Sequence, residues 1–150
     1  MPRIHSRSWV AAPIEDVFAF FDDPANLARL MPPPVSIRLV NVAPRPPQAG
    51  TVIEFSYGIG PFRRSWVVRL LEHEPPSHIV DETVSGPVKR FHHSHTFSTA
   101  RDGGTWIEDQ VDFHVGPDGP TGAVVDFVAG LVMRATFVWR AVRQRLLLPQ

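Results

Sequence analysis

The stretch that decides the fold is the last apolar run of the chain, TGAVVDFVAGLVMRATFVWRAVRQRLLL, which spans residues 121–148. No proline interrupts it before Pro149, and Gly130 is the only strong helix-weakening residue after Gly122. At about 100° per residue, most of its large apolar residues fall on one broad stripe, and its polar residues fall mainly on the opposite side. The stripe comprises Val124, Phe127, Val128, Leu131, Ala135, Val138, Trp139, Val142 and Leu146, and the opposite side carries Asp126, Arg140, Arg143 and Gln144.

This pattern predicts an amphipathic helix of about 25 residues, roughly 35–40 Å long. Asp126, Arg134, Arg140 and Arg143 interrupt every window of spanning length, so we expect no transmembrane helix and no stable membrane insertion. A helix cannot bury a stripe this wide by itself. We therefore expect the preceding residues to supply the surface on which it packs, with the apolar stripe facing inward.

Length and charge narrow the class of protein. The chain has 150 residues, enough for a real core, and we expect residues 1–150 to form one domain. Lys and Arg together number 15, as do Asp and Glu, so the composition indicates no nucleic-acid partner. The absence of cysteine excludes disulfides and thiolate chemistry. The N-terminal segment has no apolar signal-peptide core, which favours a cytoplasmic protein.

The chain begins with one strand and two short helices. Residues 4–11 alternate as a strand, which Pro13 ends. Pro13, Glu15 and Asp16 are typical of a helix start, because proline suits the first turn and acids favour its positive end. We expect this helix to end near residue 22 and a second short helix to cover residues 25–30.

From there to residue 115 the sequence has a period of two, which is typical of β-strands. Turn residues divide it into segments at hairpin spacing, and consecutive strands joined by tight turns imply an antiparallel sheet. The sequence thus predicts an α+β fold in which a seven-stranded, curved antiparallel sheet wraps around the long C-terminal helix. The six predicted strands of this region are 35–43, 51–57, 64–73, 78–84, 88–99 and 105–115.

Several segments resemble the START/Bet v1-like superfamily, which has the helix-grip fold and is often labelled polyketide cyclase/dehydrase or SRPBCC. The matching segments are VAAPIEDVF (10–18) with DPANL (23–27), Trp66 in GPFRRSW, EPP (74–76), VDE (80–82), GPVKRFHHSHTF (86–97), GTWIED (104–109), the Pro117/Gly119 turn and FVWR (137–140). The resemblance covers the whole chain and is closest to the bacterial branch of small stand-alone ligand-binding domains. It specifies a fold rather than a reaction, because this superfold hosts lipid carriers, hormone receptors and cyclases.

Alternation assigns the inward face of the last two predicted strands. In 105–115 the odd positions are apolar apart from Asp109, so we expect this set to face inward. The hairpin turn between the strands places Asp109 opposite His95 or Phe97. The predicted inward set of the preceding strand is Phe91, His93, His95 and Phe97.

A carboxylate beside an imidazole allows two interpretations. Asp109 can fix the tautomer of His95 or His93 and raise its basicity for acid/base catalysis or for orienting a ligand carbonyl. It can equally form a satisfied buried pair that only fixes the strand register. His93 and His95 also suggest a metal site, but no third ligand is fixed by the pattern and no cysteine is present, so we expect no metal and no cofactor.

Polar groups on the inward face favour a cavity, because a dry core rarely contains them. We therefore expect a small hydrophobic molecule, lipid-, aromatic- or polyketide-like, to bind between the helix and the sheet. Arg134, at the edge of the helical stripe, is a candidate anchor for an acidic head group. The predicted ligand-binding residues are Phe55, Tyr57, Trp66, Phe91, His93, His95, Phe97, Asp109, Val111, Phe127, Leu131, Arg134 and Val138.

Two other functions stay open. One is a cyclase, dehydratase or hydrolase in which His95 is the acid/base and Asp109 its partner. The other is a partner-binding or quinone-chaperone module, which the family resemblance also permits. Met133 and Phe137 fall outside the apolar stripe at i and i+4, which predicts an exposed apolar pair on a monomer. Either a homodimer forms through that face, or the loop of residues 44–50 folds over the pair.

Overall fold

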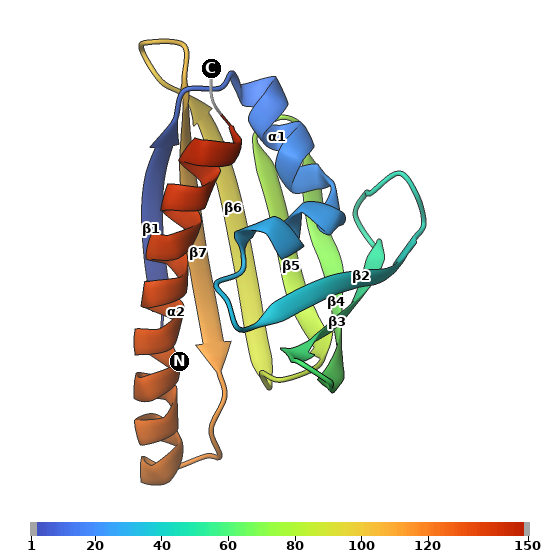
Figure 1. Ribbon diagram of the computed structural model, residues 1–150, viewed down its shortest axis with the longest axis vertical. Coiled ribbons are helices and arrows are strands. Elements are labelled where there is room, and N and C mark those ends of the chain that lie inside the picture. The colour runs from blue at the N-terminus through green and yellow to red at the C-terminus, as the bar shows by residue number, and fades with distance from the viewer. Residues whose placement is uncertain (1–2, 149–150) are drawn as a thin grey trace.

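The computed structural model describes residues 3–148 and shows one sheet with three helices on one side of it (Figure 1). The two short helices follow the first strand, and the second of them is a 3-10 helix. The elements are β1 (Arg3–Val10), α1 (Ile14–Asp22), η1 (Pro24–Leu30), β2 (Ser36–Ala43), β3 (Val52–Ile59), β4 (Phe62–Glu74), β5 (His78–Ser85), β6 (Arg90–Thr99), β7 (Thr105–His114) and α2 (Pro120–Leu147).

The seven strands form a single antiparallel sheet in the order β1-β7-β6-β5-β4-β3-β2. From β2 to β7 each strand pairs with the next one in the chain, as their tight turns require, and β1 adds to the free edge of β7. Figure 1 shows α2 running along the β1–β7–β6 end, while α1 and η1 lie over the middle of the sheet. This is the predicted α+β helix-grip fold, and the prediction is confirmed.

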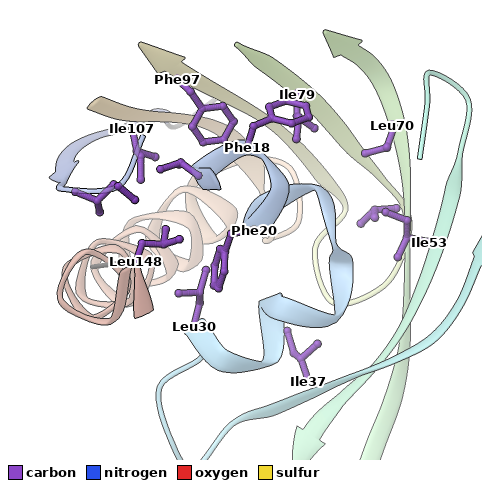
Figure 2. Close-up of a cluster of buried hydrophobic side chains, with 14 of the residues drawn as sticks. Phe18, Phe20, Leu30, Ile37, Ile53, Leu70, Ile79, Phe97, Ile107 and Leu148 are labelled. Atoms are coloured by element: carbon purple, nitrogen blue, oxygen red, sulfur yellow. The ribbon is translucent and has the colours of Figure 1, made fainter. Parts of the chain in front are cut away.

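Strand alternation assigns the core correctly in β7. Ile107, Val111 and Phe113 are fully buried, and Asp109 lies among them as the one acid of the set. Phe97 of β6 and Phe18 of α1 meet edge-on with ring centroids 5.9 Å apart, which joins the helical layer to the sheet. Figure 2 shows these side chains converging, together with others from η1, β2–β5 and the end of the chain.

The orientation of α2 contradicts the sequence-based expectation. The helix forms and is two-faced as predicted, but its apolar stripe points to solvent. Phe127 is 69% exposed and Val138 is 68% exposed. The same is true of the other large members of the stripe, so the prediction that the stripe packs on the sheet is wrong. The exposed large residues are Val124, Val125, Phe127, Val128, Leu131, Val132, Val138, Trp139, Val142 and Leu146.

Polar and small residues of α2 make the inward contacts instead. The Asp126 carboxylate accepts the backbone N–H groups of Val115 and Gly116 at 2.7 and 3.0 Å. Near the other end of the helix, Ser8 donates to the side-chain oxygen of Gln144 at 3.0 Å. Each of these groups is satisfied by a partner that only the sheet side offers, so turning the helix around would leave buried polar groups unpaired.

Glycine makes close approach possible at the start of α2. A side chain at Gly122 would place its first carbon 1.4 Å from the carbonyl oxygen of Pro117, so no other residue fits. Besides Met133 and Phe137, the inward face of this helix carries small and polar residues. A search for apolar periodicity assigns such a mixed face to solvent, which explains the inverted prediction.

The expected exposed pair on α2 is also wrong. Phe137 is only 6% exposed and Met133 is half-buried, and both face the sheet. A homodimer through these two residues therefore has no surface to use. By length and composition, Pro120–Leu147 is apolar enough to cross a membrane, contrary to the expectation that its charges exclude this. The only helix of this kind among the described residues packs against the sheet along one side.

The packing on β7 gives a test of the fold. Phe113 is fully buried near the backbone of Gly130, so Phe113→Ala should lower the free energy of unfolding by about 3–5 kcal/mol. Phe62 is 82% exposed at the start of β4, and Phe62→Ala should change the free energy of unfolding by less than about 0.5 kcal/mol. Urea unfolding of both variants measures the difference. Equal destabilisation would contradict the assignment of the inward face.

Candidate functional site

A cavity of about 260 Å³ lies between the sheet, α2 and the two short helices. Its wall is mainly apolar, since α1 and η1 contribute Phe20, Phe21 and Leu27 while the sheet contributes aromatic and aliphatic side chains. One group of polar side chains lies in the wall on β5, β6 and α2, namely Asp81, His93, His95 and Arg140. The other polar lining residues are Asp23 and Asn26, at η1, and Thr136 of α2.

Two histidines and two carboxylates form a buried network behind and along this wall. Nε2 of His93 lies 2.9 Å from Oδ1 of Asp109. Nδ1 of His95 lies 2.9 Å from the same oxygen, although not aligned as a hydrogen bond, and its Nε2 lies 3.2 Å from Oδ2 of Asp81. The two imidazole rings stack with centroids 3.7 Å apart. His95 thus stands between two carboxylates, and His93 contacts only one.

The strand register creates this network. Asp109 pairs with His95 across β6 and β7, which is one of the two registers that the hairpin allowed. Asp81 pairs with His93 across β5 and β6, so three adjacent strands place their acid and imidazole groups on one face. The local sequence explains each placement, because strict alternation leaves these side chains no other face.

The two carboxylates keep His95 protonated. Burial alone would lower its pKa, but the contacts with Asp109 and Asp81 outweigh that cost and raise the pKa of His95 to about 9. Burial would also raise the pKa of both acids, yet the contacts with the histidines hold the pKa of Asp81 below its usual value and that of Asp109 well below it. At neutral pH the network therefore holds one imidazolium and two carboxylates.

His93 is neutral in the same network. Burial, followed by the positive charge of the neighbouring His95, lowers its pKa to about 4 despite its contact with Asp109. The edge of the Phe137 ring completes its surroundings at 5.7 Å between centroids. The two stacked rings thus differ in charge because their surroundings differ: His95 is charged and His93 is neutral.

Arg140 carries a buried donor with no carboxylate beside it, whereas Nδ1 of His95, the other buried atom without an aligned hydrogen bond among the described residues, lies 2.9 Å from Asp109. Arg140 reaches the cavity from α2, is only 7% exposed, and its Nε has no hydrogen-bond partner among the described residues. Its guanidinium carbon lies 5.0 Å from the centre of the Phe137 ring, a cation–π contact that leaves the donors free. Its positive charge also helps to lower the pKa of Asp81. A buried donor without an acceptor is costly, so this atom requires an explanation.

A metal ion is the alternative occupant of the network. One ligand atom each of Asp81, His93 and His95 lies within 4.8 Å of the others, a set of two imidazoles and one carboxylate that suits iron or zinc. In this structure the Nε2 atoms of the two histidines face different carboxylates, and the charges balance without a cation. The expectation of no metal stays a prediction.

The predicted site residues divide into three groups. Those that line the cavity are Phe55, Trp66, Phe91, His93 and His95, and Asp109 lies directly behind them. Tyr57, Phe97 and Val111 belong to the packed clusters around the cavity. The inward placement of Phe127, Leu131 and Val138 is wrong, because they are exposed on α2, and Arg134 is exposed there too and cannot anchor a ligand in this cavity.

The sequence analysis missed Asp81, Arg140, Met133 and Phe137. Asp81 was detectable, because it alternates with the buried Ile79 on β5. The three helical residues were not, because their position depends on which face of α2 meets the sheet. The wall contributed by α1 and η1 was missed for a similar reason, since a short helix gives no sign of what it covers.

Comparison with known proteins agrees with this geometry. Residues 10–142 match the sequence profile of the family described as polyketide cyclase / dehydrase and lipid transport. The chain belongs to this family. The match spans most of the sheet, both short helices and the cavity-lining part of α2, so the family and the START/Bet v1-like fold predicted from the sequence are confirmed together. A search of curated protein sequences found no match.

Several solved structures share the fold of this family member at low sequence identity. A protein of Rhodobacter sphaeroides is 20% identical, with a TM-score of 0.76 over 97% of this chain and 91% of that one. The di-domain ARO/CYC StfQ of the steffimycin biosynthetic pathway is 14% identical, with a TM-score of 0.74 over 97% of this chain and 50% of that one. Ara h 8.0201 is 17% identical, with a TM-score of 0.67 over 97% of each chain.

The opposite pKa shifts of the two histidines predict a stability maximum. Between about pH 6.5 and 9 the folded His95 holds a proton that the unfolded chain releases, so its contribution to stability is lost as pH rises through 9. Between about pH 4 and 6.5, His93 binds a proton in the unfolded chain but not in the folded protein, so the free energy of unfolding falls as the pH drops. The two histidines therefore favour a maximum of the free energy of unfolding near pH 6.5, which urea unfolding at a series of pH values measures.

His95→Gln should flatten the alkaline side of this profile and also weaken the acidic side, because the charge on His95 helps to lower the pKa of His93. His5→Gln, at an exposed position on β1, is the control and should keep both sides. An unchanged alkaline slope in His95→Gln would contradict the assignment of a charged His95.

Proposed function

We propose that the protein binds a small, uncharged, largely apolar molecule in the cavity, with an oxygen of that molecule accepting a hydrogen bond from Arg140. Family membership supports ligand binding in general terms. The observation that carries the finer proposal is the guanidinium group of Arg140, which belongs to the cavity wall and whose buried Nε has no hydrogen-bond partner among the described residues. Arginine has donors and no acceptor, so the missing ligand atom is an acceptor.

Charge balance argues for an uncharged ligand. Asp81 and Asp109 supply two negative charges, and His95 and Arg140 supply two positive charges, while His93 is neutral. A carboxylate brought into this site would add an uncompensated charge within reach of Asp81, at a large desolvation cost. A carbonyl oxygen meets the need of Arg140 at no such cost. The earlier expectation of an acidic head group on Arg134 is thereby replaced.

The cavity also limits the size of the ligand. A volume of about 260 Å³ lies just below the range of roughly 300–1,000 Å³ that is usual for drug-sized molecules. The apolar wall around it favours a body of one or two rings or a short branched chain. Phe20, Phe21 and Trp66 provide flat surfaces on which such a body can pack.

Matched naphthalene probes test this proposal. The methyl ketone 2-acetylnaphthalene, the hydrocarbon 2-ethylnaphthalene and the anion 2-naphthoate have nearly the same shape, and their fluorescence reports binding. We expect the ketone to bind best, by about 2 kcal/mol or roughly thirtyfold over the hydrocarbon, the value of a hydrogen bond to a charged group. The anion should bind worst.

Arg140→Met should remove the preference for the ketone, because it keeps an apolar side chain and loses the donors. Arg134→Met removes the same charge from the exposed side of the same helix and should leave the preference unchanged. Comparing two probes within each variant makes the result independent of any loss of stability. Binding of no probe would refute ligand binding in this cavity, and a preference that survives Arg140→Met would refute the role of Arg140.

Proton transfer is the second candidate function, favoured by the charged His95 at the cavity wall. The imidazolium of His95, held between Asp81 and Asp109, lines the same cavity as Arg140. When a ligand carbonyl oxygen takes a proton from it and water takes a proton from the neighbouring carbon, the ketone becomes its enol, which is the first event in many cyclisations and dehydrations. A pure carrier would need His95 only to balance the charge.

Exchange of the methyl protons of 2-acetylnaphthalene in D₂O separates an enzyme from a carrier. If His95 donates the proton, NMR should show exchange that the protein accelerates, and His95→Gln should slow it by roughly 10²–10⁴-fold. The rate should also fall as pH rises through 9, where His95 loses its proton. An exchange rate equal to that of the free ketone would leave binding as the function.

A further inference from the structure

The outward face of α2 is the largest unexplained feature of the surface. Ten large apolar residues between Val124 and Leu146 are exposed along it, and Phe127 and Val138 are each more than two-thirds exposed. They lie on a straight, well-packed helix rather than a loop, so the chain cannot fold them away (Figure 1). The cavity and its polar network lie on the opposite side of the same helix.

The area of this face exceeds what an isolated domain normally exposes. From the exposed fraction and type of each residue, the face presents on the order of 1,000 Å². The largest apolar patch on a typical monomer is roughly 300–600 Å², and each partner in a standard protein interface buries about 800 Å². A face of this size is sufficient for stable association.

The charges around the face are of one sign. Asp126 is the only acid between Pro120 and Leu148, and it is buried against the sheet. Arg134 and Arg145 are exposed along one edge of the stripe, and Arg143 is partly exposed along the other edge. Nε of Arg145 donates to the carbonyl oxygen of Trp9 and Nε of Arg143 to that of Arg29, so the guanidinium nitrogens that remain for phosphate contact on these two are the terminal ones. The nearest exposed acid in the chain is Asp118, in the loop before the helix. An apolar stripe with arginine at both edges is typical of a helix that lies at an anionic lipid surface.

Self-association fits this arrangement less well. In an antiparallel dimer with two-fold symmetry, each edge of the stripe lies against the same edge of the second molecule. Arg134, near the middle of the stripe, would therefore approach the Arg134 of the second molecule. A parallel pair would bring the Arg145 edge against the Arg143 edge. Both arrangements juxtapose like charges, whereas phosphate head groups would neutralise them.

We propose that α2 docks flat on an anionic membrane surface through this face. The apolar side chains enter the boundary between head groups and acyl chains, and the arginines at the edges contact the phosphates. The inward side of α2 stays on the sheet, held by Asp126 and Gln144, so the helix lies along the membrane and does not cross it. This inference is independent of the identity of any ligand in the cavity.

Co-sedimentation with vesicles tests the proposal. Vesicles of equal parts phosphatidylglycerol and phosphatidylcholine should bind the wild-type protein, and vesicles of phosphatidylcholine alone should bind it at least tenfold more weakly. Raising the salt concentration should reduce binding to the anionic vesicles, because it screens the arginines. Trp139, within the face, should add a blue shift of the fluorescence on binding.

Val138→Glu, in the centre of the face, should weaken vesicle binding by roughly tenfold or more, and Arg134→Gln by about fivefold. Phe62→Glu introduces the same charge at an exposed apolar position on β4 and is the matched control, with binding unchanged. Sedimentation velocity on the same proteins reports self-association. The proposal would be overturned if the wild-type protein did not bind the vesicles, whether it is a monomer or a dimer that Val138→Glu dissociates. It would also be overturned if Phe62→Glu lost as much vesicle binding as Val138→Glu.

Discussion

The rotation of α2 about its own axis is the constraint on which the rest of the structure depends. Asp126 fixes it near one end, by accepting the backbone N–H groups of Val115 and Gly116, and Gln144 fixes it near the other through Ser8. The bonds from Gly116 and Val115 lower the pKa of Asp126 to about 2, so the carboxylate stays ionised and keeps both partners across the physiological range. With both ends fixed, every residue between them has a determined direction.

Two consequences follow from that rotation, on opposite sides of one helix. On the inner side, Arg140 enters the cavity and meets the network of His95, Asp81 and Asp109, where its charge completes a neutral set. On the outer side, the apolar stripe is left uncovered. A half-turn of the helix would reverse both outcomes, but it would leave the backbone N–H groups of Val115 and Gly116 and the Ser8 hydroxyl without the acceptors that Asp126 and Gln144 supply.

The site itself shows how burial and charge assign roles to similar groups. His93 and His95 stack on adjacent inward positions of one strand, yet one is neutral and the other charged. The difference arises because Asp81 contacts only His95, and because the charge on His95 then disfavours a second charge beside it. Cytoplasmic placement stays a prediction.

The sequence alone determined the element order and the antiparallel sheet, and it limited the cross-strand partner of Asp109 to His95 or Phe97, between which the structure decides. Strand alternation and short turns are local rules, and a one-residue shift in register would expose Ile107 and Phe113 to water. The sequence also identified the apolar stripe of α2. Only the tertiary structure decided which way this stripe faces, and with it the roles of Arg140, Arg134, Phe137 and Phe127. The physical reason is that helical periodicity records how residues are grouped around an axis, whereas direction depends on hydrogen-bond partners that lie elsewhere in the chain.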